Sequence, residues 1–310
     1  MQRLLLENDS MKIEVSSLGA ELQSLYSKKT KQEYLWQPGG EIWPHHSMLL
    51  FPNPGRIAQD RILVDGKIYP AMMHGFAYDA DFEMLHITKN EVWLELKDSE
   101  YTRRYFPYEF RLQVGFRLDN DQLFQTFRVL NDSERTMYFS IGAHPGFYCP
   151  IALGECGDDY SLVFDCPQNI DCLELDQHTR LLTGKRVSLL KAEKEIKLGE
   201  HFFDEGPLLL EGIKANSITL RSCRSGSFVE MGIKNFPYMC LWGPPGKMSL
   251  IAIEPWCGTS DLLDTDHVWE RKLGIESVEP GQAFERVISF RMGSSCQTFS
   301  DSSYGFQQLL

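Results

Sequence analysis

The chain has 310 residues, of which 43% are hydrophobic and 24% charged, a composition that excludes a disordered, collagen-like or coiled-coil protein. Its formal net charge is −12, from 31 Lys and Arg residues against 43 Asp and Glu residues. Because a protein that binds duplex nucleic acid needs a basic face, this balance predicts a small-molecule partner, neutral or weakly charged, and no nucleic acid.

Alternating apolar and polar residues, the pattern of half-buried β-strands, dominate the sequence. Residues 62–69 predict a hairpin that turns at Asp65-Gly66, a strong hairpin dipeptide. A second hairpin is expected where 111–118 and 123–130 alternate on either side of a turn at 119–121. Further strands are predicted at 92–97, 137–141, 218–221, 248–254 and 284–290.

A helical pattern is weak throughout the chain, and its best candidate is 188–198. There Leu189, Ala192 and Ile196 share a helical face, although the segment could equally be an irregular connection. Many strands with few helices predict an all-β protein, either stacked antiparallel sheets or a barrel. We expect one domain over residues 1–292 and a polar, loosely ordered tail over 293–310.

The eight cysteines include no C-x-x-C pair, which argues against a zinc site or a redox motif. The apolar stretch Leu4–Leu6 is too short for a signal peptide, and no run approaches the 18 apolar residues of a membrane span. We therefore expect a soluble cytoplasmic protein with free thiols and no membrane partner.

Two early motifs present single polar side chains on rigid turns. Residues 51–57 (FPNPGRI) hold two prolines and a glycine before Arg56, whose planar fork of donors suits hydroxyl or carboxylate oxygens. Most such turns are scaffolding, so a surface arginine is the plainer alternative. In His74-Gly75-Phe76, a lone histidine before glycine is more often structural than functional.

Two later motifs place a histidine and a glutamate where buried strands are expected to end. His144 follows the strand at 137–141 and lies among small residues, so a ligand has room beside an acid or base that titrates near neutrality. Glu254 follows a strand that is apolar on both faces, and burial there would raise its pKa toward that of a general base. A strand-capping histidine and a buried ion pair are the structural alternatives. Trp256 offers an apolar platform for a sugar ring, whereas Trp242 is expected in the core.

The sequence resembles the aldose 1-epimerases, or galactose mutarotase-like proteins. The resemblance is carried by four motifs in this order: F-P-N-P-G-R, H-G-F, G-A-H-P-G-F and I-E-P-W-x-G-T-S-D. The similarity extends over residues 1–292 and is greatest to a bacterial branch associated with lactose operons. It implies a single-domain antiparallel β-sandwich that acts as an isomerase on sugar hemiacetals. It implies no metal or other cofactor, and the sequence has neither a P-loop nor an H-E-x-x-H motif.

The resemblance also implies roles for individual residues. His144 matches the general acid that protonates the ring oxygen, and Glu254 matches the general base that takes the proton of the anomeric hydroxyl. His74 matches a second histidine near the ring oxygen, and Arg56 a substrate-binding arginine. The family's aspartate that binds sugar hydroxyls has no direct match: the alignment places Gly206 there, and Asp204, two residues earlier, is the candidate.

The main prediction is thus a mutarotase that interconverts the anomers of a free hexose, as a monomer or homodimer. One alternative is a hexose-6-phosphate 1-epimerase, for which Arg103 and Arg104 could supply a phosphate site. Another is a sugar-binding protein without catalysis. A glycoside hydrolase would need a second carboxylate beside Glu254 and would leave His144 without a role.

Overall fold

A computed structural model describes residues 1–39 and 42–294 and confirms the all-β expectation. In these ranges the regular structure consists of antiparallel strands and five short 3₁₀ turns. The turns are η1 (Ala58–Asp60), η2 (Ala77–Asp79), η3 (Thr102–Arg104), η4 (Gly157–Asp159) and η5 (Trp269–Arg271).

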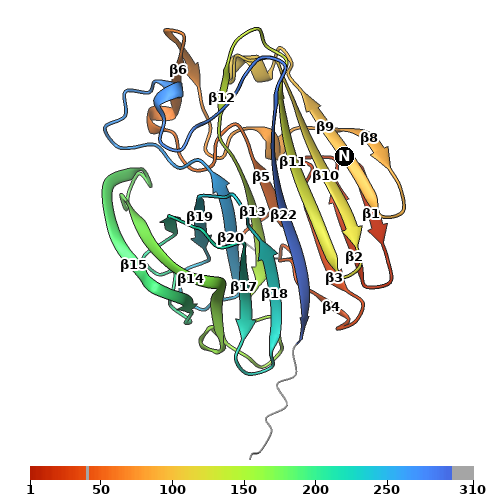
Figure 1. Ribbon diagram of the computed structural model, residues 1–310. Helices are drawn as coiled ribbons and strands as arrows, with labels where there is room; N and C mark the ends of the chain where they lie inside the picture. Colours follow the sequence, from red (N-terminus) through yellow and green to blue (C-terminus); the bar gives the residue numbers. More distant parts are fainter. Residues whose placement is uncertain (40–41, 295–310) are drawn as a thin grey trace, which may run out of the picture.

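One large sheet organises the molecule. Its spatial order is β5, β13, β20, β19, β16, β14, β17, β18, β22, β11, β10, β9 and β8, with β15 paired to β14. The bounds are β5 (Ser47–Leu50), β8 (Glu83–Ile87), β9 (Glu91–Lys97), β10 (Phe110–Asp119), β11 (Gln122–Asn131), β13 (Ile141–Tyr148), β14 (Tyr160–Leu175), β15 (Leu182–Lys197), β16 (Leu208–Glu211), β17 (Ser217–Ser222), β18 (Ser227–Gly232), β19 (Tyr238–Trp242), β20 (Leu250–Cys257) and β22 (Ala283–Ser294). Figure 1 shows β22 and β8–β11 on one side of the molecule and the long β14–β15 hairpin curving out on the other.

Smaller elements complete the fold. A second sheet contains β1 (Arg3–Glu7), β2 (Met11–Ser16), β3 (Leu22–Ser27) and β4 (Gln32–Glu33). Two short pairs are β6 (Arg61–Val64) with β7 (Lys67–Pro70), and β12 (Met137–Phe139) with β21 (Glu276–Val278). Buried side chains of β2, β10 and β11 belong to one hydrophobic core, so the two sheets pack as a sandwich.

Both predicted hairpins form as expected. At the β6–β7 turn, Asp65 and Gly66 have φ values of 48° and 73°, the left-handed geometry that a tight hairpin turn requires. In β10 and β11, residue 119 pairs with 122 and residue 110 with 131, so the register continues without a shift over the whole hairpin. The apolar residues of the alternating pattern, such as Leu112 and Val129, face the core.

The helix considered at 188–198 is wrong, because this segment belongs to β15. Its pairing with β14 contains several register shifts, which break the period of two and leave a false helical spacing. At one irregularity Ala192 has a φ of 56°, and its N–H donates to the side-chain oxygen of Asn169.

The expectation that His144 and Glu254 stand at strand ends is also wrong. The expected strand is interrupted at Ser140, whose N–H donates to the carbonyl of Pro52. A new strand, β13, begins at Ile141. His144 therefore lies in the middle of β13, and Glu254 lies inside β20, whose eight residues are all buried.

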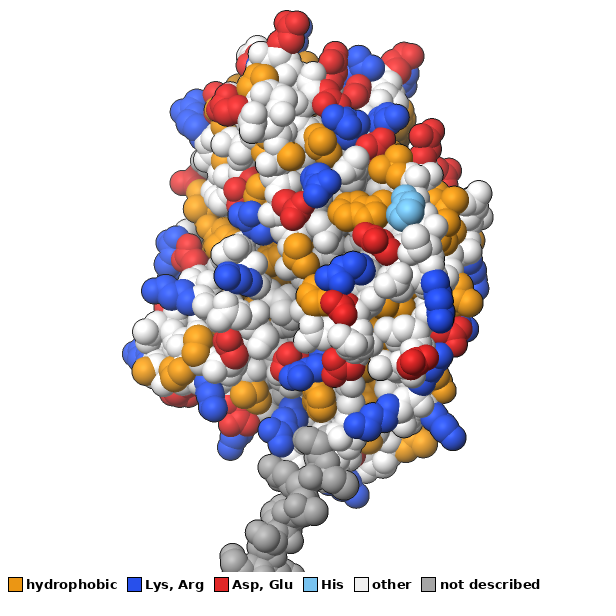
Figure 2. All heavy atoms as spheres, turned by 45° about the vertical axis from the view of Figure 1, so that its right-hand side comes forward, with side chains coloured by type: hydrophobic (Ala, Val, Ile, Leu, Met, Phe, Trp, Pro, Cys, Tyr) orange, Lys and Arg blue, Asp and Glu red, His pale blue; other side chains and the backbone are white. Residues whose placement is uncertain are grey.

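The tail boundary expected at residue 293 is wrong, because Gly293 and Ser294 still belong to β22. The rest of that predicted segment, 295–310, lies outside the described residues. On the face shown in Figure 2, acidic and basic side chains are interspersed. Among the described residues, no helix is long and apolar enough to cross a membrane, and all seven cysteines are free.

Candidate active site

A cavity of about 570 Å³ lies against the middle of β13, β19 and β20. All six residues singled out from the sequence line it, although they come from five separate parts of the chain: Arg56, His74, His144, Asp204, Glu254 and Trp256. Within the described residues, no group of three His, Cys, Asp or Glu side chains could hold a metal ion.

Strand register brings His144 and Glu254 together. In the β13–β20 pair, Gly142 faces Trp256 and Gly146 faces Ala252, so His144 and Glu254 occupy opposing positions with side chains on one face. The Nε2 atom of His144 lies 3.2 Å from Oε1 of Glu254. The two groups are thus close enough to exchange a proton.

Burial shifts the pKa values of this pair in opposite directions. His144 is 7% exposed and Glu254 only 1% exposed. Loss of water raises the pKa of Glu254 well above its usual value and lowers that of His144 well below, with His74 adding to the second effect. Both shifts favour the neutral forms, a carboxylic acid on Glu254 and an imidazole on His144.

Aromatic rings enclose His144. The indole of Trp43 stacks on its ring at a centroid distance of 4.7 Å, and Trp242 approaches edge-on at 6.0 Å. Trp242 therefore lines the cavity, and its expected place in the core is wrong. Trp256 is 3% exposed, and its closeness to the Glu254 carboxyl lowers the pKa of that group, against the larger effect of burial.

The turn that carries Arg56 is held by the segment after β20. The backbone N–H of Arg56 donates to Oγ of Ser260 at 3.1 Å, and its carbonyl accepts the N–H of Asp261 at 2.8 Å. Gly55 has a φ of 70°, and a side chain on it would collide with Ser260. Ser260 and Asp261, in the G-T-S-D part of the motif that begins at Ile253, thus position Arg56.

His74 is fixed as a neutral hydrogen-bond donor. Its Nδ1 accepts the backbone N–H of Gly55 at 3.1 Å, so the neutral ring carries its proton on Nε2. Burial, and secondly the charge of Arg56, lower its pKa to about 4. The ring lies 5.7 Å from that of His144, centroid to centroid.

Asp204 reaches the cavity, but other groups already hold its carboxylate. Its Oδ1 accepts the N–H of Gly246 at 2.7 Å, and its Oδ2 lies 3.0 Å from Nδ1 of His201. Arg103 and Arg104, considered for a phosphate site, do not line the cavity. They pair with Asp98 and Glu100 respectively, so that expectation is wrong.

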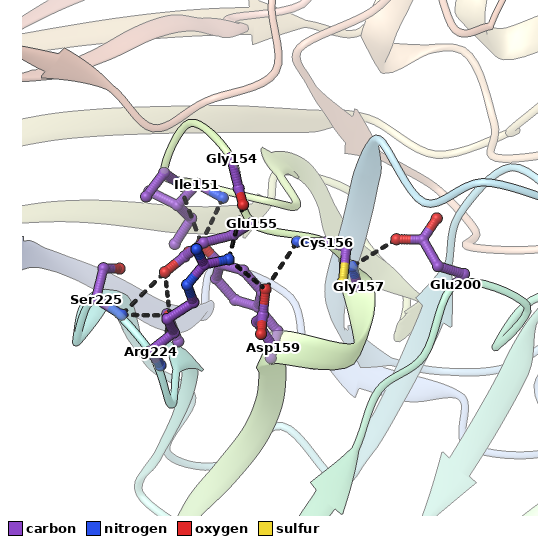
Figure 3. Close-up of polar contacts among 12 residues, drawn as sticks. Ile151, Gly154, Glu155, Cys156, Gly157, Asp159, Glu200, Arg224 and Ser225 are labelled. Carbon is purple, nitrogen blue, oxygen red and sulfur yellow. Dashed lines mark hydrogen bonds and ion pairs between the residues drawn. The ribbon is translucent and has the colours of Figure 1, made fainter.

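A polar network fixes the loop between β13 and β14 (Figure 3). Arg224 donates to the carbonyl of Gly154, and Glu155 accepts the N–H of Ser225. In the same loop, the N–H of Gly157 donates to Glu200 at 2.7 Å. This last bond ties the loop to the segment that continues to Asp204, four residues after Glu200.

Several lining residues were not singled out as site residues from the sequence. They are Trp43, His45, Tyr78, Arg180 and Cys240. The run Trp43-Pro44-His45-His46 carried a usable signal, since aromatic and histidine side chains gather there just before a buried strand. Arg180 carried none, because it stands in an ordinary polar turn and reaches the cavity only through long-range pairing.

Comparisons with known proteins show the family to which the chain belongs. The family model for aldose 1-epimerase matches residues 2–212. Protein LacX (chromosomal) of Lactococcus lactis is 31% identical over 282 residues, which cover 89% of this chain and 94% of that protein. A galactose mutarotase related enzyme from Lactobacillus acidophilus superposes with a TM-score of 0.89 at 32% identity, over 94% of this chain and 98% of that one.

A galactose mutarotase-like protein from Lactobacillus casei is also similar in structure, with a TM-score of 0.88 at 28% identity, over 94% of this chain and all of that one. The sequence matches and the solved structures therefore agree with the resemblance carried by the motifs. The chain belongs to the aldose 1-epimerase family.

Proposed function

We propose that this protein is a mutarotase, which interconverts the α and β anomers of an aldohexose by acid–base catalysis. The observation that carries the proposal is the buried pair of His144 and Glu254, 3.2 Å apart on the floor of the cavity. Family membership supports the reaction class, and the pair supplies the two proton-transfer groups that the reaction needs.

The reaction opens the hemiacetal ring and closes it on the other face of the carbonyl. The carboxylate of Glu254 takes the proton of the C1 hydroxyl, and the electrons of that O–H bond form the C1 carbonyl. The bond from C1 to the ring oxygen breaks, and the ring oxygen takes a proton from the imidazolium of His144. Rotation about C1–C2 follows, and the same two transfers run backward.

The pair holds the correct number of protons for this cycle. The reactive form, carboxylate with imidazolium, and the resting form, carboxylic acid with imidazole, contain the same number of protons and differ only in which group carries one of them. Transfer across the 3.2 Å contact converts one form into the other. His74, as a neutral donor, and Arg56 line the same cavity, and in this proposal they bind oxygens of the sugar.

The geometry is less favourable to a glycoside hydrolase. Among the described residues that line the cavity, Asp204 and Glu254 are the carboxylates. Asp204 is already engaged with Gly246 and His201, so it is poorly suited to act as nucleophile or base.

The test is polarimetry of freshly dissolved α-anomers of glucose, galactose, their 6-phosphates and their uronic acids. We expect the protein to speed the decay of optical rotation for at least one sugar, with the rate unchanged by a chelator. Methyl α-galactoside, which has no anomeric hydroxyl, should stay intact. Decay at the buffer rate for every sugar would overturn the proposal, and release of galactose from the glycoside would point to a hydrolase.

A further inference from the structure

Two arginine side chains line the cavity without a carboxylate partner. Neither the Arg56 nor the Arg180 guanidinium makes an ion pair within the described part of the chain. The two carboxylates of the cavity face other groups, Asp204 toward Gly246 and His201 and Glu254 toward His144. In a chain with a net charge of −12, this cavity thus presents two uncompensated cations.

Arg180 occupies the place where the family resemblance calls for an acidic side chain. Gly206, which aligns with the sugar-binding aspartate, has a φ of 100°. A Cβ atom built on it would lie 2.5 Å from Nη1 of Arg180 and 3.0 Å from Cζ. The guanidinium therefore lies against the Gly206 backbone and fills the space of a side chain there, so the charge at this point is reversed.

The turn between β14 and β15 holds Arg180 in place. Its backbone N–H donates to the carbonyl of Asp176 at 2.9 Å, and the Asp176 side chain accepts the N–H groups of His178 and Thr179. Two residues on, the N–H of Leu182 donates to the carbonyl of Asp261, in the segment that also positions Arg56. Both arginines are thus fixed to the same part of the fold.

The surroundings strengthen an interaction with an anion. Apolar side chains also line this cavity: Leu175, Phe203, Pro207, Leu209 and Pro245. In such a setting water competes less for the guanidinium, whose planar fork of donors matches the oxygens of a phosphate or a carboxylate. Sugar hydroxyls alone would leave two positive charges uncompensated.

Resting on the proposed function, we infer that the substrate is an anionic aldose and that Arg180 is the residue that selects it. The sugar carries a phosphate or a carboxylate away from C1, so the hemiacetal lies at His144 and Glu254 while the anionic group meets the Arg180 guanidinium. Arg56 supplies a second positive charge to the same cavity.

Equilibrium binding tests this inference without relying on catalysis. The tryptophans of the cavity provide a fluorescence signal for titration with galactose, galactose 6-phosphate and galacturonate, and with the three matching glucose compounds. We expect at least one anionic sugar to bind more than tenfold tighter than its neutral parent. Which anion shows the preference decides between a phosphosugar and a uronic acid.

Substitutions at Arg180 test whether this residue causes the preference for an anionic sugar. Arg180→Gln keeps much of the side-chain length and removes the charge, and it should lower the anionic-to-neutral affinity ratio at least tenfold. Arg180→Lys keeps the charge and should retain part of the ratio. Arg104→Gln, which removes an exposed arginine outside the cavity, serves as the matched control and should keep the ratio of the wild type. The thermal midpoint of each variant checks its folding.

Two outcomes overturn the inference: neutral sugars that bind as tightly as the anionic ones, or a preference that survives Arg180→Gln. Polarimetry on the same sugars separates this failure from failure of the proposed function. Catalysis without an anionic preference would refute only the substrate class. A strong anionic preference without catalysis would refute the mutarotase and leave Arg180 as the anion-selecting residue of a binding protein.

Discussion

At the scale of single residues, the informative feature is a histidine and a glutamate that are both buried and yet 3.2 Å apart. A structural ion pair in such a place has its attraction offset by lost hydration, so it is weak evidence for stability. The opposed pKa shifts of Glu254 and His144 instead favour the neutral form of each group. Passing the carboxyl proton to His144 separates charge within the pair but leaves its net charge unchanged, which suits acid–base catalysis.

The pKa of His74 gives a prediction about acid stability. Its folded pKa of about 4 lies below the ordinary value of 6.5, so the stability due to neutral His74 is complete above pH 6.5 and is lost as the pH falls through 4. His74→Asn keeps an acceptor for the N–H of Gly55 but cannot take up this proton. We expect the thermal midpoint of the wild type to fall more between pH 6.5 and 4 than that of the variant.

If the thermal midpoints of the wild type and of His74→Asn fell equally between pH 6.5 and 4, the assignment of His74 as a buried neutral imidazole would be contradicted. The exposed His178 provides the matched control. His178→Asn removes an imidazole from a surface turn, and its thermal midpoint should fall between pH 6.5 and 4 as much as that of the wild type.

The sequence could identify five cavity residues because each stands in a short motif with an unusual combination of residue types, and the family resemblance added Asp204. It could not identify Arg180, since the reversal of charge beside Gly206 depends on how the β14–β15 turn packs against a loop 26 residues later, a distance in sequence (206 − 180) that no local pattern spans. It also could not show that Asp204 is engaged by Gly246 and His201.

At the scale of elements, a buried ion pair behind the cavity ties the last motif to the first. Nζ of Lys272 lies 3.8 Å from Oδ1 of Asp261 and also contacts the carbonyl of Thr259. The other oxygen of Asp261 accepts the N–H of Ala58, just beyond Arg56. Burial lowers the pKa of Lys272 to about 8, although Asp261 partly offsets this effect.

Removal of this lysine should destabilise the fold, because Lys272→Met leaves the Asp261 carboxylate buried without its cation. We expect the free energy of unfolding, measured with urea, to fall by about 3–5 kcal/mol. The double variant Lys272→Met/Asp261→Asn should recover part of that loss. Lys194→Met, at an exposed position of β15, should change stability by less than about 0.5 kcal/mol. A loss of that small size in Lys272→Met would show that the pair does not hold the segment.

Elements were predictable where the period of two continues to a clear turn, as in the β10–β11 hairpin. Elements were not predictable where a bulge interrupts this period, as in β15, because the shifted residues imitate helical spacing. The division between β12 and β13 also escaped prediction, because it depends on the hydrogen bond from Ser140 to Pro52, which comes from a different part of the chain.

At the scale of the whole molecule, the abundance of strands predicted the all-β class, and the family resemblance selected the sandwich. The order of strands was beyond reach of the pattern. β22, the last strand, pairs with both β11 and β18, which joins segments from distant parts of the sequence and gives the large sheet its continuity. β13 and β20 pair directly with each other near the β5 edge of the same sheet, and their register creates the site.

The central claim is that Glu254 and His144 transfer the protons of anomer interconversion. Its most direct test is NMR saturation transfer between the α and β anomeric proton signals of a sugar that the wild type turns over. Glu254→Gln and His144→Asn should each slow the exchange by about 10²–10⁴-fold, and the double variant should lose little more, since both groups serve one step. Glu193→Gln, at an exposed position of β15, should exchange at the wild-type rate.

The thermal midpoint, measured on the same samples, decides between catalysis and a structural role. We predict near-native melting for Glu254→Gln, because burial raises the pKa of Glu254 and so favours the neutral carboxyl that the glutamine amide resembles. Exchange at the wild-type rate in Glu254→Gln would contradict the account, as would a steep loss of melting temperature in both single variants with the remaining folded protein fully active.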